Sequence, residues 1–183
     1  KQPNHSVLHY NLALTYAQLG DMVNANKHFI RSYNLDAKNY ISGIYAVMTS
    51  QLINKDSKKL FSIIKEVIAS EKPSEHIELC KTLMALSEGN LVGTADWLHN
   101  NYKANPLYLT LSSIVAMKQN NMDSAKKHTK ELTAMLPDEI IAHLMYIDAH
   151  YRELKPKEYA RESLVYLRRQ NFSFRDLYFG AHI

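Results

Sequence analysis

The chain has 183 residues, 46% of them hydrophobic, and a formal net charge of +4 at neutral pH, which suits one domain with a substantial core. One cysteine, Cys80, excludes an intrachain disulfide framework, and no apolar run approaches the ~18–20 residues that cross a bilayer. The mild positive charge permits acidic partners without requiring them.

Breakers of regular structure are rare. Only five glycines and five prolines occur, and the chain is rich in leucine, alanine, lysine, methionine and glutamate. These residues favour helix over strand. Because the chain starts at Lys1 with no secretory signal, we expect a longer parent chain, and localisation stays open between cytoplasm and periplasm.

The segment 6–39 predicts two helices separated by a break at Gly20-Asp21. Glycine suits this break because it tolerates positive φ without steric cost. On each helix, apolar and small residues recur at the helical period of three to four, so we expect one inward face per helix. These inward positions are Leu12, Ala13 and Tyr16 in the first helix and Ala25, Phe29 and Ser32 in the second.

This run of large, small and aromatic positions resembles the tetratricopeptide repeat, a helix–turn–helix unit of about 34 residues. His9 stands where the family usually has tryptophan, and Ala37 replaces its closing proline. The resemblance implies an all-α, right-handed solenoid of antiparallel helix pairs, with about five pairs in a chain of this length. In the family, the first helix of each pair lines a concave groove that binds peptides or helices.

The later repeats follow from periodicity and from helix start and stop signals. Ser57 or Asp56 is expected to cap a helix with Leu60, Ile63 and Ile64 inward, and Asn105-Pro106 is a strong helix start. Leu164 is expected to face inward on the last complete helix. The predicted units of a single solenoid domain are about 6–39, 40–73, 74–105, 106–137 and 138–171, with a preceding repeat's tail at 1–5 and a further helix starting in 172–183.

Metal and catalytic sites find little support. His5 and His9, and likewise His76 and Cys80, are four residues apart and can share a helix face, but zinc needs about four converging ligands. His9 is better explained as packed between helices. No phosphate-binding loop and no nucleophile signature is present. We therefore predict no enzyme activity, no cofactor, no metal and no small-molecule substrate.

Basic residues cluster on the second helices of their pairs, as in Lys126-Lys127-His128. In the family these helices form the convex wall, so a solvated face explains the cluster better than phosphate binding does. Interleaved acids and the small net charge further weaken the case for nucleic acid.

The first helices predict the binding site. Projecting the family's register gives a groove lined by Tyr10, Asn11, Leu14, Ile44, Tyr45, Met48, His76, Leu79 and Leu83. Such an apolar groove should favour a hydrophobic peptide or an amphipathic helix, unless neighbouring helices bury it. Tyr10 and Leu14 replace the lysine and asparagine with which some family members clamp a terminal carboxylate, so that clamp is not supported.

The function that follows from the resemblance is non-enzymatic protein–protein scaffolding. The family allows settings that include bacterial envelope, secretion, pilus and flagellar-motor assemblies, and oligomers could form through exposed terminal repeats. The alternative is a regulatory solenoid that binds peptides or RNA.

Overall fold

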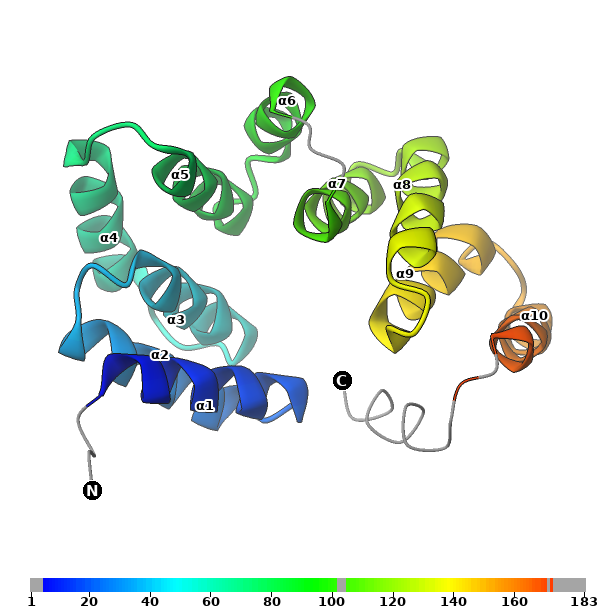
Figure 1. Cartoon of the computed structure of the whole chain (residues 1–183), viewed down its shortest axis with the longest axis horizontal. Coiled ribbons are helices and arrows are strands. Elements are labelled where there is room, and N and C mark those ends of the chain that lie inside the picture. Colours follow the sequence, from blue (N-terminus) through cyan, green and yellow to red (C-terminus); the bar gives the residue numbers. More distant parts are fainter. Residues whose placement is uncertain (1–4, 102–104, 171, 173–183) are drawn as a thin grey trace. The chain divides into compact units, whose positions relative to one another are not determined.

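The computed structural model describes residues 5–101, 105–170 and 172, and within these ranges the regular secondary structure is entirely α-helical (Figure 1). Two compact units are present among the described residues, 5–90 with helices α1–α5 and 91–172 with helices α6–α10. The helices are α1 (Ser6–Gln18), α2 (Met22–Leu35), α3 (Tyr40–Leu52), α4 (Lys58–Ser70), α5 (Glu75–Ser87), α6 (Leu91–Asn100), α7 (Pro106–Lys118), α8 (Met122–Met135), α9 (Ile140–Tyr151) and α10 (Pro156–Arg169).

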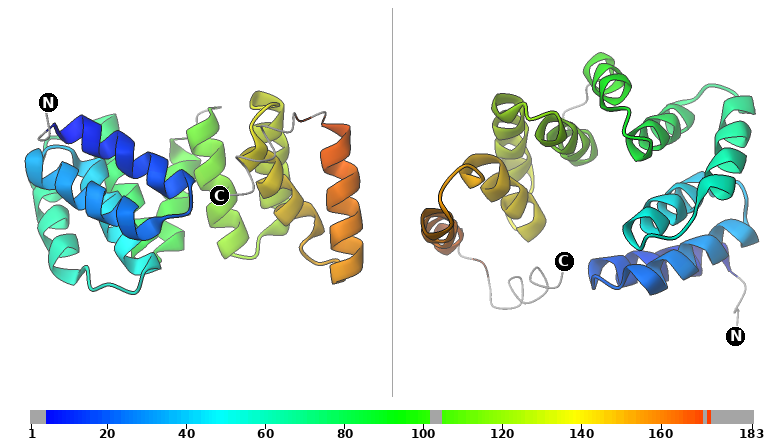
Figure 2. Two further views of the ribbon diagram at one scale, coloured as in Figure 1. Left: turned by 90° about the horizontal axis from the view of Figure 1, so that it is seen from below. Right: turned by 180° about the vertical axis from the view of Figure 1, so that it is seen from behind.

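Within each unit, successive helices pack against their neighbours in the chain, as in a helical repeat solenoid (Figure 2). This confirms the predicted all-α class. Residues 1–4 and 173–183 lie outside the described residues. Of the predicted tail of a preceding repeat only His5 is described, and of the predicted further helix only Phe172, so both stay predictions. The single solenoid domain also stays a prediction.

Helices α1 and α2 pack against each other in the first unit. Ala13 and Ala25 are both fully buried there, and they form a core cluster with Phe29 and Ala46 of α3. A methyl side chain at each crossing point lets the two backbones approach closely, and the larger Phe29 fills the space next to them. The small residues singled out in the sequence therefore sit at the helix crossing.

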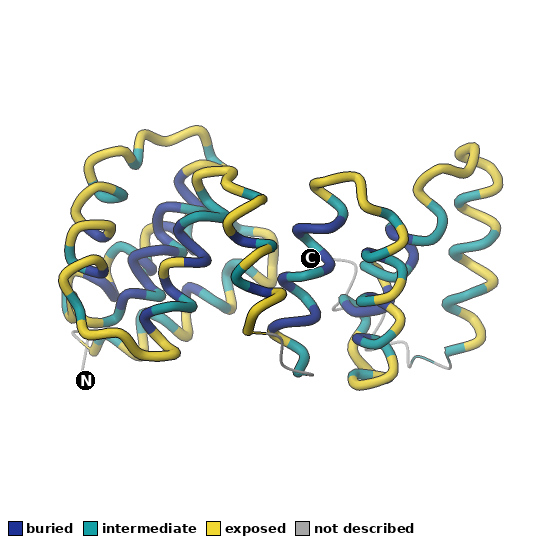
Figure 3. The backbone as a smooth tube through the Cα atoms, turned by 90° about the horizontal axis from the view of Figure 1, so that it is seen from above, coloured by how far each residue is buried: buried dark blue, intermediate teal, exposed yellow. Residues whose placement is uncertain are grey.

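Helix α3 is the centre of the first unit, because it contacts α2, α4 and α5. It is also the helix with the most buried positions, which Figure 3 shows as dark segments of the tube. Gly43 makes one of these contacts: a Cβ at this position would lie 2.7 Å from Ile64 Cδ1 and 3.0 Å from Tyr33 Cδ2. A side chain at this position would therefore force Ile64 or Tyr33 to shift.

A buried asparagine joins α2 to α3. The Asn26 side chain is 2% exposed, and its Nδ2 donates to Ala46 O and Ser50 Oγ at 2.8 Å and to Thr49 Oγ1 at 3.1 Å. A buried amide is stable only when its hydrogen-bonding groups are paired. The bonds fix the register of α3 on α2, and no sequence signal pointed to Asn26.

Local chemistry explains where the helices begin and end. Gly20 has φ 77°, as the predicted break requires, and Asp21 caps α2 by accepting a hydrogen bond from Asn24 N at 3.0 Å. Asn105 caps α7 in the same way, with Pro106 in the first turn. The side chain of Ser57 makes no capping bond to α4; instead Asp56 Oδ1 accepts from Lys58 N at 3.0 Å.

The second unit is built on α7, α8 and α9. Leu109, Leu132 and Ala142 form one buried cluster, and Ala116, Ala125 and Ala149 form the other. None of the residues of α10 is buried, and this helix packs mainly against α9.

Aromatic and histidine side chains join α10 to α9. The Tyr166 ring stacks on Tyr146 at 4.6 Å, and its hydroxyl lies 2.8 Å from His143 Nδ1. Burial raises the pKa of Tyr166 to about 12. Phe172 contacts the ring of His143 edge to face at 4.9 Å.

Three predicted inward residues are exposed instead. Leu12 is 40%, Ile63 43% and Leu164 50% exposed. Only a narrow stripe of each helix meets a neighbour in these units: Ala13 on α1, and Ile64 with Ile68 on α4. Leu12 precedes Ala13 and Ile63 precedes Ile64, so each is turned by 100° from the covered residue beside it.

Candidate binding surface on α1, α3 and α5

The nine predicted groove residues come from three helices of the first unit, and the structure separates them into two groups. Ile44 is fully buried and Leu83 is 5% exposed, so both belong to the core. They are inaccessible because α2, α4 and α5 pack around α3. The other seven are exposed or partly buried, and we call them the α1–α3–α5 surface: Tyr10, Asn11, Leu14, Tyr45, Met48, His76 and Leu79.

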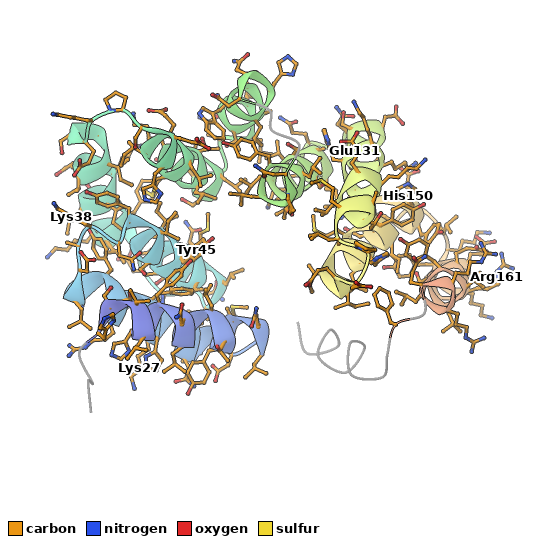
Figure 4. All side chains as sticks on the ribbon, viewed as in Figure 1. Lys27, Lys38, Tyr45, Glu131, His150 and Arg161 are labelled. Atoms are coloured by element: carbon orange, nitrogen blue, oxygen red, sulfur yellow. The ribbon has the colours of Figure 1, made fainter. Side chains whose placement is uncertain are left out.

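An aromatic cluster links α1 to α3 at this surface. The rings of Tyr10 and Tyr45 stack with centroids 6.4 Å apart and planes 11° apart, and each also contacts the buried ring of Phe29, at 6.0 Å and 5.4 Å. Figure 4 labels Tyr45 on α3, next to α1. Packing against Phe29 holds both tyrosine rings in place, although neither is fully buried.

The partial burial of these tyrosines has an electrostatic consequence. Desolvation raises the pKa of both Tyr10 and Tyr45. Their hydroxyls, which are neutral at physiological pH like those of other tyrosines, can donate or accept one hydrogen bond beside an apolar ring. Rigid aromatic rings with a polar tip are the residue type most enriched at protein interfaces.

The edge of the first unit between α3 and α5 is also held by polar contacts. Gln51 Nε2 donates to Ser87 O at 3.2 Å, which ties the end of α3 to the end of α5. At the opposite end of α3, the Tyr40 hydroxyl donates to Glu71, and this bond raises the pKa of Tyr40 to about 12. Tyr45 and Met48 thus lie on a helix that is fixed at both ends.

His76 and Cys80 share a face of α5, as their spacing predicted. Cys80 Sγ lies 3.8 Å from His76 Nε2, but Cys80 is fully buried and burial raises its pKa to about 11. A nucleophilic cysteine needs the opposite shift, toward the thiolate. The pair therefore lacks the electrostatics of a catalytic Cys–His dyad, and among the described residues no three histidine, cysteine or acidic side chains converge as metal ligands.

The histidine in the place of the family's tryptophan packs between helices, as predicted. His9 stacks on His28 of α2 at 5.1 Å, and their Nδ1 atoms are 2.9 Å apart. Tyr16 stacks on the same His28 ring at 5.5 Å. Desolvation by burial and the neighbouring His9 lower the pKa of His28.

Sequence reasoning missed one row of exposed leucines on α1. Leu8 and Leu12 of α1 are 55% and 40% exposed, and their spacing of four places them on one side of the helix; Leu19, which follows the helix, is 54% exposed. The signal was present, since two faces of α1 are apolar, but one helical period cannot tell which face is covered.

Among the described helices, none is long and apolar enough to cross a membrane.

No protein-family model matches the chain, and no curated protein matches it. The likeness to tetratricopeptide repeats therefore remains a resemblance of residue pattern.

Proposed function

We propose that the protein is a non-enzymatic scaffold whose α1–α3–α5 surface binds a segment of a partner protein, as members of the tetratricopeptide repeat family do. The stacked pair of Tyr10 and Tyr45 carries this proposal, because these rings combine a fixed orientation with partial exposure. Ordering a free tyrosine on binding costs side-chain entropy, and rings already held by Phe29 avoid most of that cost.

The chemistry of the surface selects the kind of segment. Leu14, Met48 and Leu79 are apolar and partly buried, and Asn11 adds an exposed amide. The seven residues of the surface contain no acidic side chain and no lysine or arginine. A hydrophobic peptide or the apolar face of an amphipathic helix complements such a surface, and methionine adapts to irregular partners.

A matched pair of substitutions tests the site without disturbing the core. Asn11→Arg places a long charged side chain on the α1–α3–α5 surface, and Asn34→Arg makes the same change at an exposed position of α2. Cross-linking from a photoreactive residue at position 11 in the native cell identifies the partner segment. Calorimetry with that segment should then show at least about tenfold weaker binding for Asn11→Arg, or about 1.4 kcal/mol, and unchanged binding for Asn34→Arg.

Salt dependence separates this function from RNA binding. The affinity for an apolar partner segment should change little as the salt concentration rises. The affinity for RNA should fall steeply with salt, because each phosphate that the protein neutralises adds to the salt dependence. Equal affinities of both arginine variants for the partner would place the site elsewhere on the molecule. A steep salt slope would favour the regulatory RNA-binding alternative.

A further inference from the structure

The second unit contains a cavity that the proposed scaffold function does not use. It has a volume of about 430 Å³ and is lined by α6, α7, the turn that follows α7, and α8. This volume lies within the range of about 300–1,000 Å³ typical of small-molecule sites. The cavity is thus large enough for a compact organic molecule.

The lining has an apolar part and a polar part. Leu98 of α6 and Val115 and Ala116 of α7 supply buried apolar side chains. Ser112 and Ser124 add hydroxyl groups from α7 and α8. A ligand that fills the cavity therefore needs an apolar body and a polar group.

The charge of the lining has one sign. Lys127 is its charged member, His99 and His128 add imidazole rings, and no acidic side chain lines the cavity among the described residues. The acidic residues on the same helices, such as Asp123 and Glu131, lie outside the lining. The polar group of a complementary ligand is therefore an anion.

The N-terminus of α8 reinforces this preference. Asn121 caps the helix by accepting from Ser124 N at 3.2 Å, and both residues line the cavity. The first turn of a 14-residue helix carries a partial positive charge that favours anions. Lys127 lies in the second turn of the same helix, so the two positive features are adjacent.

His128 has an unused hydrogen-bonding atom in this wall. Its Nδ1 is buried and has no hydrogen-bond partner among the described residues. Burial is the largest influence on the pKa of His128 and lowers it, so the ring is neutral at pH 7 and offers one N–H donor. A buried polar atom without a partner is costly, and a ligand that reaches it by rotation of the ring gains that hydrogen bond.

We propose that this cavity binds a small organic anion, with its apolar body against Leu98, Val115 and Ala116 and its acidic group between Lys127 and the N-terminus of α8. A free carboxylic or sulfonic acid and the terminal carboxylate of a peptide share this chemistry. A volume of about 430 Å³ suits a compact free acid better than a peptide chain. The site lies on helices that the proposed scaffold surface does not include, so either proposal can fail without the other.

Two fluorescent probes with the same aromatic body test the preference for an anion. 1-Anilinonaphthalene-8-sulfonate carries one sulfonate, and N-phenyl-1-naphthylamine carries none. The sulfonate should bind the full chain saturably and at least about tenfold more tightly than the neutral probe. Equal affinities of the two probes would overturn the proposal.

Three variants test whether the probe binds in the cavity. Lys127→Ala should weaken sulfonate binding about tenfold, while Lys130→Ala, which removes an exposed lysine of α8 outside the lining, should leave it unchanged. Ser112→Leu should fill the cavity and abolish binding. Helical circular dichroism shows whether each variant is folded, and imidazole NMR signals of His99 and His128 in the unaltered chain report the site independently of folding. Failure of these signals to move on probe saturation would overturn the proposal.

Competition distinguishes the two sources of the acid. Octanoate should displace the sulfonate probe at a lower concentration than a hexapeptide that ends in leucine. Displacement by the peptide alone would overturn the small-molecule site in favour of a protein ligand.

Discussion

The hydrogen bonds of Asn26 offer a sharp test of how the first unit is held together. Substitution by alanine removes an amide that is 2% exposed and that donates to acceptors on α3, two of them at 2.8 Å. The amide has two N–H groups, and each buried hydrogen bond contributes about 0.5–1.5 kcal/mol net. The expected loss in the free energy of unfolding is therefore about 1–3 kcal/mol.

Asn34→Ala is the matched control, because Asn34 lies exposed on the same helix. Both substitutions gain the same helix propensity, of a few tenths of a kcal/mol, so the difference between the two variants isolates the buried bonds. With a urea slope of about 2 kcal/mol/M, a difference of about 2 kcal/mol separates the two unfolding midpoints by about 1 M. Circular dichroism follows the unfolding.

Hydrogen exchange then locates the effect. Peptides from α2 and α3 should exchange faster in Asn26→Ala than in Asn34→Ala, while peptides from α8 and α9 should exchange alike. Identical midpoints and exchange rates for the two variants would refute the reasoning that Asn26 fixes α3 on α2.

Three further predictions concern space, protonation and reactivity. Gly43→Ala should destabilise the first unit by about 1 kcal/mol in urea unfolding. A Cβ 2.7 Å from the buried Ile64 Cδ1 costs about 1–3 kcal/mol, whereas the gain in helix propensity offsets only about 0.5–1 kcal/mol. The pKa of His28 is lowered in the folded state. Its contribution to stability is therefore complete above the unfolded-state pKa of about 6.5 and is lost as the pH falls below that value. Between pH 7.5 and 5.5, the urea midpoint should drop less for His28→Phe than for the unaltered chain. Cys80, with a pKa raised to about 11, should react with a disulfide reagent at pH 8 at least about 100-fold more slowly in the folded chain than in concentrated guanidinium.

Each of these predictions has an outcome that contradicts it. A Gly43→Ala variant as stable as the unaltered chain would mean that Ile64 can move away. His28→Phe keeps the ring stack with Tyr16 and His9, so an equal drop of both midpoints would assign the pH dependence to other histidines. Equal thiol reactivity in the folded and unfolded states would contradict the burial of Cys80.

The sequence alone determined the helices and their ends, because these depend on neighbours within a few residues. Gly20 has positive φ at the predicted break, and Asp21 and Asn105 cap the helices that follow them. Short polar side chains bond to backbone N–H groups two or three positions ahead in almost any context.

Only the tertiary structure decided which side chains are covered. Ile44 and Leu83 are buried although they were predicted to line a groove, while Leu12 and Ile63 are exposed although they were predicted to point inward. A helix that is apolar on two faces does not specify which face a neighbour covers, since that depends on the orientation of helices distant in sequence.

The cavity of the second unit is likewise decided by how the helices pack. Lys127 lies in a basic run that resembled a solvated wall, and only the packing of α6, α7 and α8 brings it to a cavity with Leu98 and Ser112. Such a cavity is a property of three helices together, each of which carries only part of its lining. Periodicity describes one helix at a time, so it fixed the elements of this protein and left their surfaces to the packing between them.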